Sequence, residues 1–290
     1  MNILLFGKTG QVGWELQRAL APLGNLIALD VHSTDYCGDF SNPEGVAETV
    51  KKIRPDVIVN AAAHTAVDKA ESEPEFAQLL NATSVEAIAK AANEVGAWVI
   101  HYSTDYVFPG TGEIPWQETD ATAPLNVYGE TKLAGELAII SAMPFNSIII
   151  RTGWVYSEFG NNFVKTILNL ATKSNTLDIV SDQIGTPTYA YDLANLILQI
   201  VGSKSFLENE KPTSIFHYSN EGKSSWYEFA KEVISISGIN CHLNPINTED
   251  YPLPAKRPKY SILSKKKISQ EYALNIDHWK DALKACLQNL

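Results

Sequence analysis

Three glycines spaced three residues apart follow the first apolar run of the chain. The run is NILLF at residues 2–6, and the loop after it reads Gly7-Lys8-Thr9-Gly10-Gln11-Val12-Gly13. Apolar residues with helical spacing then begin, over residues 11–21. A glycine-rich turn between a buried strand and a helix presents free backbone N–H groups and the positive end of the helix dipole to an anion. We therefore expect the pyrophosphate of a dinucleotide to bind here, with a plain tight turn as the alternative.

Short apolar runs alternate with longer helical patterns as far as residue 151. Strands are expected at residues 26–31, 56–60, 97–101 and 147–151, and helices at residues 41–53, 75–95 and 128–142. Ser41 and Glu44 have the spacing of a capping box at the start of the first of these helices. Strands separated by helices predict an α/β fold, a doubly wound parallel sheet of the Rossmann type. Its ligand should lie at the carboxyl ends of the strands.

The pattern changes after about residue 155, where helical segments mix with turns and prolines. Helices are expected at residues 161–172, 192–201, 225–237 and 278–287. This predicts a dinucleotide-binding Rossmann domain at residues 1–155. Residues 156–290 would form mainly a smaller substrate-binding lobe, from which some segments can return to the first domain.

Composition excludes several classes of function. The chain has 290 residues, with 23 Lys and Arg against 33 Asp and Glu, a net charge of −10. This argues against general binding of nucleic acid, which needs a basic face. The first residues do not resemble a signal peptide, and no apolar run is as long as a membrane span. The three cysteines are far apart and form no C-x-x-C motif, so we expect a reduced cytoplasmic protein without a disulfide framework or a zinc site.

Two Y-x-x-x-K pairs occur, and their contexts differ. Tyr128 and Lys132 lie one helical turn apart, after the polar loop at residues 103–108 that follows an expected strand. An ammonium group near a phenol lowers the phenol's pKa, and a phenol so tuned can protonate a developing alkoxide. Tyr227 and Lys231 have no such loop before them, and we interpret them as an ordinary pair on a helix surface. Ser103 or Thr104 would hold the substrate carbonyl oxygen, and Thr104 is preferred.

Together these motifs resemble the extended short-chain dehydrogenase/reductase superfamily. The order is the G-x-x-G-x-x-G loop, Asn60-Ala61-Ala62-Ala63, S-T-D-Y-V-F and Y-x-x-x-K. Within it the chain is most similar to the dTDP-4-dehydrorhamnose reductase family, through segments such as HYSTDYVFPGTG and PLNVYGETKLAGE. That resemblance implies NADH- or NADPH-dependent reduction of the C4 keto group of dTDP-4-dehydro-6-deoxy-L-mannose to dTDP-L-rhamnose, a step toward cell-surface polysaccharide such as O-antigen.

The resemblance also implies roles for individual residues. The catalytic group would be Thr104, Tyr128 and Lys132, with Tyr128 as the proton donor. The cofactor would contact Gly7, Gly10, Gln11, Val12, Gly13, Asp30, Asp39, Phe40, Ala63, His64, Thr65, Tyr102, Tyr128 and Lys132. The substrate would contact Thr104, Asp105, Tyr128, Trp154 and Arg257, although Arg257 could equally form a surface salt bridge and His64 could merely cap a strand. Asp30 favours NAD, whereas Lys8 could meet the 2′-phosphate of NADP, so both cofactors stay open.

Alternatives remain at this level. Some relatives dimerise around magnesium held by glutamates, and Glu15 matches one such position. Residues 189–192 (Tyr-Ala-Tyr-Asp) contain no glutamate, so magnesium is possible but not favoured, and a homodimer is possible. A different function would be that of a non-catalytic, NADP-binding regulatory subunit like that of methionine adenosyltransferase. A related nucleotide-sugar reductase, epimerase or dehydratase is a third hypothesis.

Overall fold

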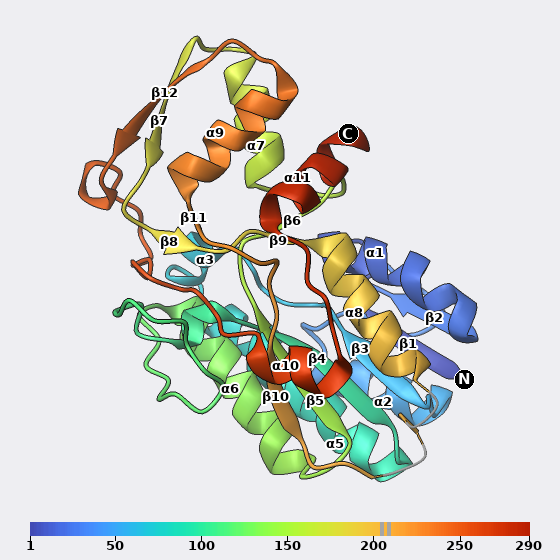
Figure 1. Ribbon diagram of the computed structural model, residues 1–290. Coiled ribbons are helices and arrows are strands. Elements are labelled where there is room, and N and C mark those ends of the chain that lie inside the picture. The colour runs from blue at the N-terminus through green and yellow to red at the C-terminus, as the bar shows by residue number, and fades with distance from the viewer. Residues whose placement is uncertain (204–205, 208–209) are drawn as a thin grey trace.

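A six-stranded parallel sheet forms the centre of the described part of the chain, which in this computed structural model is residues 1–203, 206–207 and 210–290 (Figure 1). The order is β10-β5-β4-β3-β1-β2. The strands are β1 (Asn2–Phe6), β2 (Asn25–Leu29), β3 (Val57–Asn60), β4 (Trp98–Thr104), β5 (Ser147–Thr152) and β10 (Ser214–His217). The prediction of a doubly wound α/β fold is confirmed. The strand order reverses between β1 and β3, the point at which such sheets bind ligands.

Helices cover both faces of this sheet. One face carries α2 (Pro43–Ile53), α5 (Ser84–Val95) and α6 (Val127–Ala142), and the other carries α1 (Gln11–Leu20), α8 (Ala190–Gly202) and α10 (Lys266–Tyr272). Successive residues of β1 alternate between the two apolar cores: Leu5 packs with α1 and α8, and Leu4 packs with α2 and α5. Burial on both faces explains why the strands are continuous apolar runs.

A smaller group of elements lies beyond the carboxyl ends of the strands (Figure 1). Its apolar core is built from α7 (Phe163–Ala171), α9 (Trp226–Ser237), α11 (Trp279–Gln288), β7 (Thr176–Val180) and β12 (His242–Ile246). Two short strand pairs connect it to the sheet: β6 (Val155–Tyr156) with β9 (Thr188–Tyr189), and β8 (Ile184–Gly185) with β11 (Ser224–Ser225). The elements α8, β10 and α10 follow residue 155 in the chain but belong to the central sheet and the helices that cover it. We therefore propose that residue 155 divides a cofactor-binding part of the chain from a mainly substrate-binding part, and that it does not separate two independently packed domains.

Short helical turns complete the chain. They are η1 (Ala21–Leu23), α3 (Val67–Ala70), α4 (Pro74–Gln78), η2 (Leu79–Thr83), η3 (Asp105–Val107) and η4 (Thr248–Asp250). The helix expected at residues 75–95 is interrupted by η2, a π-helical turn. Asn81 in this turn accepts a hydrogen bond from the His64 backbone N–H at 2.8 Å and donates to the His64 carbonyl at 3.1 Å. The π turn thus fixes the chain just after β3, at the edge of the candidate site.

The structure corrects the predicted cap of one helix and the predicted end of one strand. Asn42, not Ser41, caps α2, because its Oδ1 accepts from the Gly45 N–H at 2.9 Å and Pro43 takes the first helical position. The strand expected at residues 97–101 continues as β4 to Thr104. That extension places the start of the polar loop on the sheet itself, where it is held rigidly.

Candidate active site

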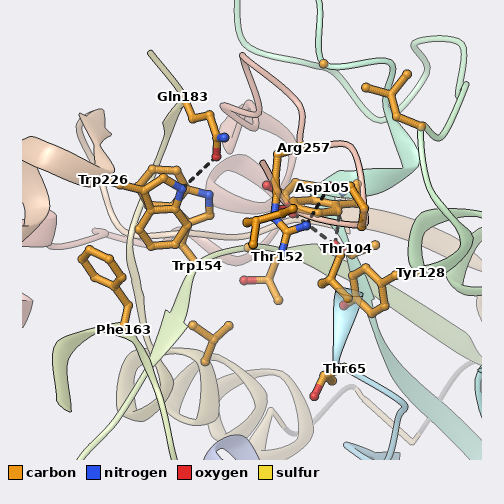
Figure 2. A pocket seen from close by; sticks show the side chains of 18 of the residues that line it. Thr65, Thr104, Asp105, Tyr128, Thr152, Trp154, Phe163, Gln183, Trp226 and Arg257 are labelled. Atoms are coloured by element: carbon orange, nitrogen blue, oxygen red, sulfur yellow. Dashed lines mark hydrogen bonds between the residues drawn. The ribbon is translucent and has the colours of Figure 1, made fainter. Parts of the chain in front are cut away.

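A cavity of about 1580 Å³ opens between the carboxyl ends of β1, β3, β4 and β5 and the smaller group of elements. Of the predicted site residues, its walls include Gly10, Gln11, Val12, Ala63, Thr65, Tyr102, Thr104, Asp105, Tyr128, Lys132, Trp154 and Arg257. Figure 2 shows Thr104, Asp105 and Tyr128 close together on one side, with Trp154 across the space from them. The structure therefore brings both ends of the expected site into one volume, large enough for a dinucleotide and a sugar nucleotide together.

The glycine loop has the shape needed at a pyrophosphate site. Gly7 has φ of +86°, and a Cβ there would lie 2.6 Å from the Ala62 nitrogen. A Cβ on Gly13 would lie 2.0 Å from the Gly7 carbonyl oxygen, so these two glycines shape the loop without lining the cavity. A Cβ on Gly10 would meet only the Gly7 carbonyl oxygen, at 3.4 Å, so it would fit without a clash at the cavity wall. The first N–H groups of α1 have no helical partners and no capping side chain, so the loop fits a dinucleotide.

The hydroxyl groups of Ser103 and Thr104 have different hydrogen-bond partners. Ser103 donates a hydrogen bond to buried Glu136, which also forms a two-point ion pair with Arg151. Thr104 faces the cavity, donates to Asp105 Oδ1 at 3.1 Å and accepts from the Tyr106 N–H at 3.2 Å. Both residues line the cavity, but the Ser103 hydroxyl is committed to the buried Glu136, so Thr104 is the hydroxyl we expect to reach a substrate oxygen.

Tyr128 lies in the first turn of α6, whose N-cap, Asn126, accepts from the Gly129 N–H at 2.8 Å. Burial raises the pKa of Tyr128 to about 12, against the opposing effect of its hydrogen bond with Thr104. The sequence-based prediction of a lowered pKa was wrong for this arrangement, since Lys132 contributes no lowering. The phenol keeps its proton throughout the neutral range, as a proton donor requires.

Lys132 is 2% exposed and points between α6 and β4. Its Nζ donates to the Tyr102 carbonyl at 2.6 Å and lies 3.3 Å from His101 Nε2. Burial lowers the pKa of Lys132 to about 8, and Glu136 opposes that shift. The amino group is thus fixed at the cavity wall and titrates close to neutral pH.

The opposite wall is aromatic. Trp154 stacks on Trp226 with ring centroids 3.5 Å apart, and Phe163 packs against Trp226 at 4.6 Å (Figure 2). Gln183 fixes this group by accepting from Trp226 Nε1 at 3.1 Å. The sequence analysis identified Trp154 as a site residue but missed Phe163, Gln183 and Trp226, whose contacts with it depend on the fold. The predicted helix at residues 225–237 does place Trp226 at the start of a helix, but the sequence does not show that it packs against Trp154.

Arg257 lines the cavity but is already paired. Its guanidinium donates two hydrogen bonds to Asp68, both 2.7 Å long, and Asp68 also accepts from the Ala255 N–H at 3.1 Å. This ion pair holds the pKa of Asp68 below its usual value. The salt bridge that was the alternative for Arg257 is therefore present, and the pair fastens the segment around Ala255 to α3. Since Arg257 also lines the cavity, its contact with a nucleotide diphosphate stays a prediction.

The remaining predicted residues do not line the cavity. Asp30 is 6% exposed and accepts from the His32 N–H at 3.0 Å, beside Lys8. Phe40 is in the core, with its ring centroid 5.3 Å from that of Phe6, and Asp39 accepts from the Ser41 N–H. His64 is 7% exposed, and its Nε2 lies 2.9 Å from a Glu73 oxygen. Their roles toward a cofactor stay predictions.

Glu15 is buried on α1, away from the cavity. In the described part of the chain no three His, Cys, Asp or Glu side chains gather where they could hold a metal ion. Burial and the neighbouring Glu158 raise the pKa of Glu15 to about 7, although Arg18 opposes them. The folded protein therefore binds a proton that the unfolded chain releases at lower pH.

Glu15→Gln is expected to stabilise the protein at alkaline pH. A carboxyl pKa of about 7, raised from 4.5, makes the free energy of unfolding fall as pH rises between those values. At about 1.4 kcal/mol per pKa unit, the rise from 4.5 to about 7 corresponds to a gain of at most about 3.5 kcal/mol over wild type above neutral pH, and far less near pH 5. Urea unfolding at both pH values measures this, and a difference independent of pH would contradict it.

Comparison with known proteins gives a consistent result. The family model described as RmlD substrate binding domain matches residues 1–290. A dTDP-4-dehydrorhamnose reductase of Escherichia coli is 62% identical, over 100% of this chain and 98% of that protein. The crystal structure of a dTDP-4-dehydrorhamnose reductase from Clostridium acetobutylicum has a TM-score of 0.92 at 38% identity, covering 100% of this chain and 99% of that one. That of the Bacillus anthracis reductase in complex with NADP has a TM-score of 0.91 at 34% identity, covering 99% of both chains.

Proposed function

This chain belongs to the RmlD substrate binding domain family, and from that premise we propose that it carries out the dTDP-4-dehydrorhamnose reductase reaction. It is an NAD(P)H-dependent oxidoreductase. The substrate is the C4 ketone of dTDP-4-dehydro-6-deoxy-L-mannose, and the product is dTDP-L-rhamnose. The observation that carries the proposal is the meeting of Thr104, Tyr128 and Lys132 on one wall of a cavity that also reaches the free N-terminus of α1.

The chain's own residues supply orientation and a proton. The nicotinamide, when bound, supplies the hydride. Thr104 donates its hydroxyl hydrogen bond to the ketone oxygen in place of Asp105, and Tyr128 gives that oxygen its proton as negative charge develops. Because the raised pKa of Tyr128 keeps its phenol protonated at neutral pH, the residue can act as the acid without first taking up a proton. The stacked Trp154 and Trp226 offer a flat apolar wall that excludes water from the sugar.

Backbone groups and Lys132 would hold the cofactor. Gln11 and Val12 line the cavity at the start of α1, where the first N–H groups have no capping side chain, and Ala63 and Thr65 line the adjoining wall. An acidic chain can bind anionic ligands in this way, because amides and one buried lysine act locally and do not depend on net charge.

No helix in the described ranges is long and apolar enough to cross a membrane. Location in the cytoplasm and assembly into a homodimer belong to this proposal.

Purified protein should oxidise NADPH or NADH when dTDP-4-dehydro-6-deoxy-L-mannose is added. The loss of nicotinamide absorbance measures turnover, and NMR of the product establishes the configuration at C4. An epimerase would change the sugar without net consumption of reduced nicotinamide, and a regulatory subunit would bind NADPH without turnover. Either result from well-folded protein would overturn the proposed function.

A further inference from the structure

Behind Lys132, three buried side chains form a row from β3 through β4 to α6. Asn60 and His101 are register partners in the sheet, and Asn60 Nδ2 lies 3.0 Å from His101 Nδ1. His101 Nε2 in turn lies 3.3 Å from Lys132 Nζ. Asn60, His101 and Lys132 are 1%, 0% and 2% exposed, so the polar atoms of the row need hydrogen-bond partners within the protein.

The backbone determines how this row is protonated. The Ala62 N–H donates to Asn60 Oδ1 at 3.0 Å, so the carbonyl oxygen of the amide is committed to that donor. The amide therefore turns its NH₂ group toward His101, and Nδ1 of the ring must accept. A neutral imidazole has one N–H, which then sits on Nε2. Nε2–H points at Lys132.

This arrangement suits a neutral amine better than an ammonium. An ammonium has three N–H groups and no lone pair, so it would place a donor against Nε2–H. A neutral amine offers its lone pair to Nε2–H. Both forms can keep the 2.6 Å hydrogen bond from Nζ to the Tyr102 carbonyl. The row thus favours the form of Lys132 that has given up a proton.

We propose that Asn60 and His101 are positioning residues for the reduction, which orient Nε2–H toward Lys132 and so favour release of the lysine proton during turnover. The inference rests on the proposed function, in which Tyr128 gives up its proton and must regain one. Nζ releases H⁺ and keeps the electron pair, which then accepts the hydrogen bond from Nε2–H. The phenolate of Tyr128 is the base in the site that needs that proton.

The charged groups around Lys132 are consistent with a neutral His101 ring. His101 faces Lys132 from β4, and Glu136 faces it from one turn further along α6. Glu136 is itself neutralised by Arg151 from β5, at 2.7 Å. Burial, and then the charge of Lys132, keep the pKa of His101 well below 6.5, so its ring is neutral at physiological pH.

NMR of the wild-type protein tests the tautomer without any substrate or cofactor. In ¹⁵N-labelled protein, long-range ¹H–¹⁵N correlations of the imidazole rings separate Nδ1–H from Nε2–H. We expect His101 to be neutral with its proton on Nε2 across the neutral pH range. A proton on Nδ1, or a cationic ring near neutral pH, would overturn the proposal. This result is independent of catalysis, so it separates failure of the row from failure of the proposed function.

His101→Met tests the effect on Lys132. Removing Nε2–H removes the opposing donor, so the titration of the Lys132 side chain and the alkaline limb of kcat should both move up by about one pH unit. His217→Met is the matched control, because His217 is also fully buried but contacts the Trp116 carbonyl at 3.1 Å and not Lys132. It should leave both values in place. An unchanged lysine titration in folded His101→Met would overturn the proposal, and the wild-type tautomer decides the matter if that variant does not fold.

Discussion

Tyr128→Phe is expected to lower kcat by about 10²–10⁴-fold while leaving the affinity for NADPH within about tenfold of wild type. The variant keeps the ring and its edge-on contact with Tyr106, whose ring centroid is 5.8 Å away, but loses the proton. Steady-state rates with the 4-keto sugar and a fluorescence titration with NADPH measure the two effects.

The chain contains its own control for this variant. Tyr227 begins the second Y-x-x-x-K pair, on α9, and its side chain packs at the edge of the apolar core of the smaller lobe and does not line the cavity. Tyr227→Phe makes the same chemical change in the same local motif, and kcat should stay within about twofold of wild type. If Tyr128→Phe retained full activity, or if both variants lost it equally, Tyr128 would not be the proton donor.

Periodicity predicted five of the six strands of the sheet, because the inner strands are buried on both faces. The edge strand β10 (Ser214–His217) was missed, since it has only four residues and its first two are partly exposed. β1 and β5 are uninterrupted apolar or nearly apolar runs bounded by helical patterns, which leaves few other interpretations. β7 and β12 were missed because they form a two-stranded pair in which exposed residues such as Thr176 and His242 weaken the apolar pattern. β6, β8, β9 and β11 have two residues each, too short for any period to appear.

The candidate site was likewise predicted only in part from the sequence. Thr104, Tyr128 and Lys132 were found because two short motifs carry them and the parallel topology brings those motifs together. The Asn60–His101 contact was not found, since it depends on the register between β3 and β4. The direction of the Tyr128 pKa shift was wrong because burial is a property of the folded protein. The partner in the salt bridge of Arg257 was not identified, because Asp68 lies 189 positions away in the sequence.

Gly10 and Gly13 have different surroundings in the loop, so replacement by alanine should have different effects at the two positions. Gly13→Ala adds a Cβ 2.0 Å from the Gly7 carbonyl oxygen, a backbone atom that cannot move without reshaping the turn. Alanine at a helical position would by itself be favoured by up to about 1 kcal/mol, but overpacking costs about 1–3 kcal/mol and more where backbone must yield. We therefore expect Gly13→Ala to lower the free energy of unfolding by about 2 kcal/mol or more, measured by urea unfolding, and to lose NADPH binding with it.

Gly10→Ala should leave stability within about 0.5 kcal/mol of wild type and still weaken NADPH binding at least about tenfold. Gly10 has φ −71° and ψ 164°, a conformation open to any residue, and its Cβ would meet nothing closer than 3.4 Å. The new methyl group would instead occupy the cavity wall beside the free N–H groups of α1, where a pyrophosphate has to approach. Loss of affinity in a fully stable Gly10→Ala protein, against loss of stability in Gly13→Ala, would distinguish the glycine that admits the cofactor from the one that shapes the loop. Unchanged affinity in Gly10→Ala would move the cofactor away from this helix, and with it the reason for placing the hydride donor beside Tyr128.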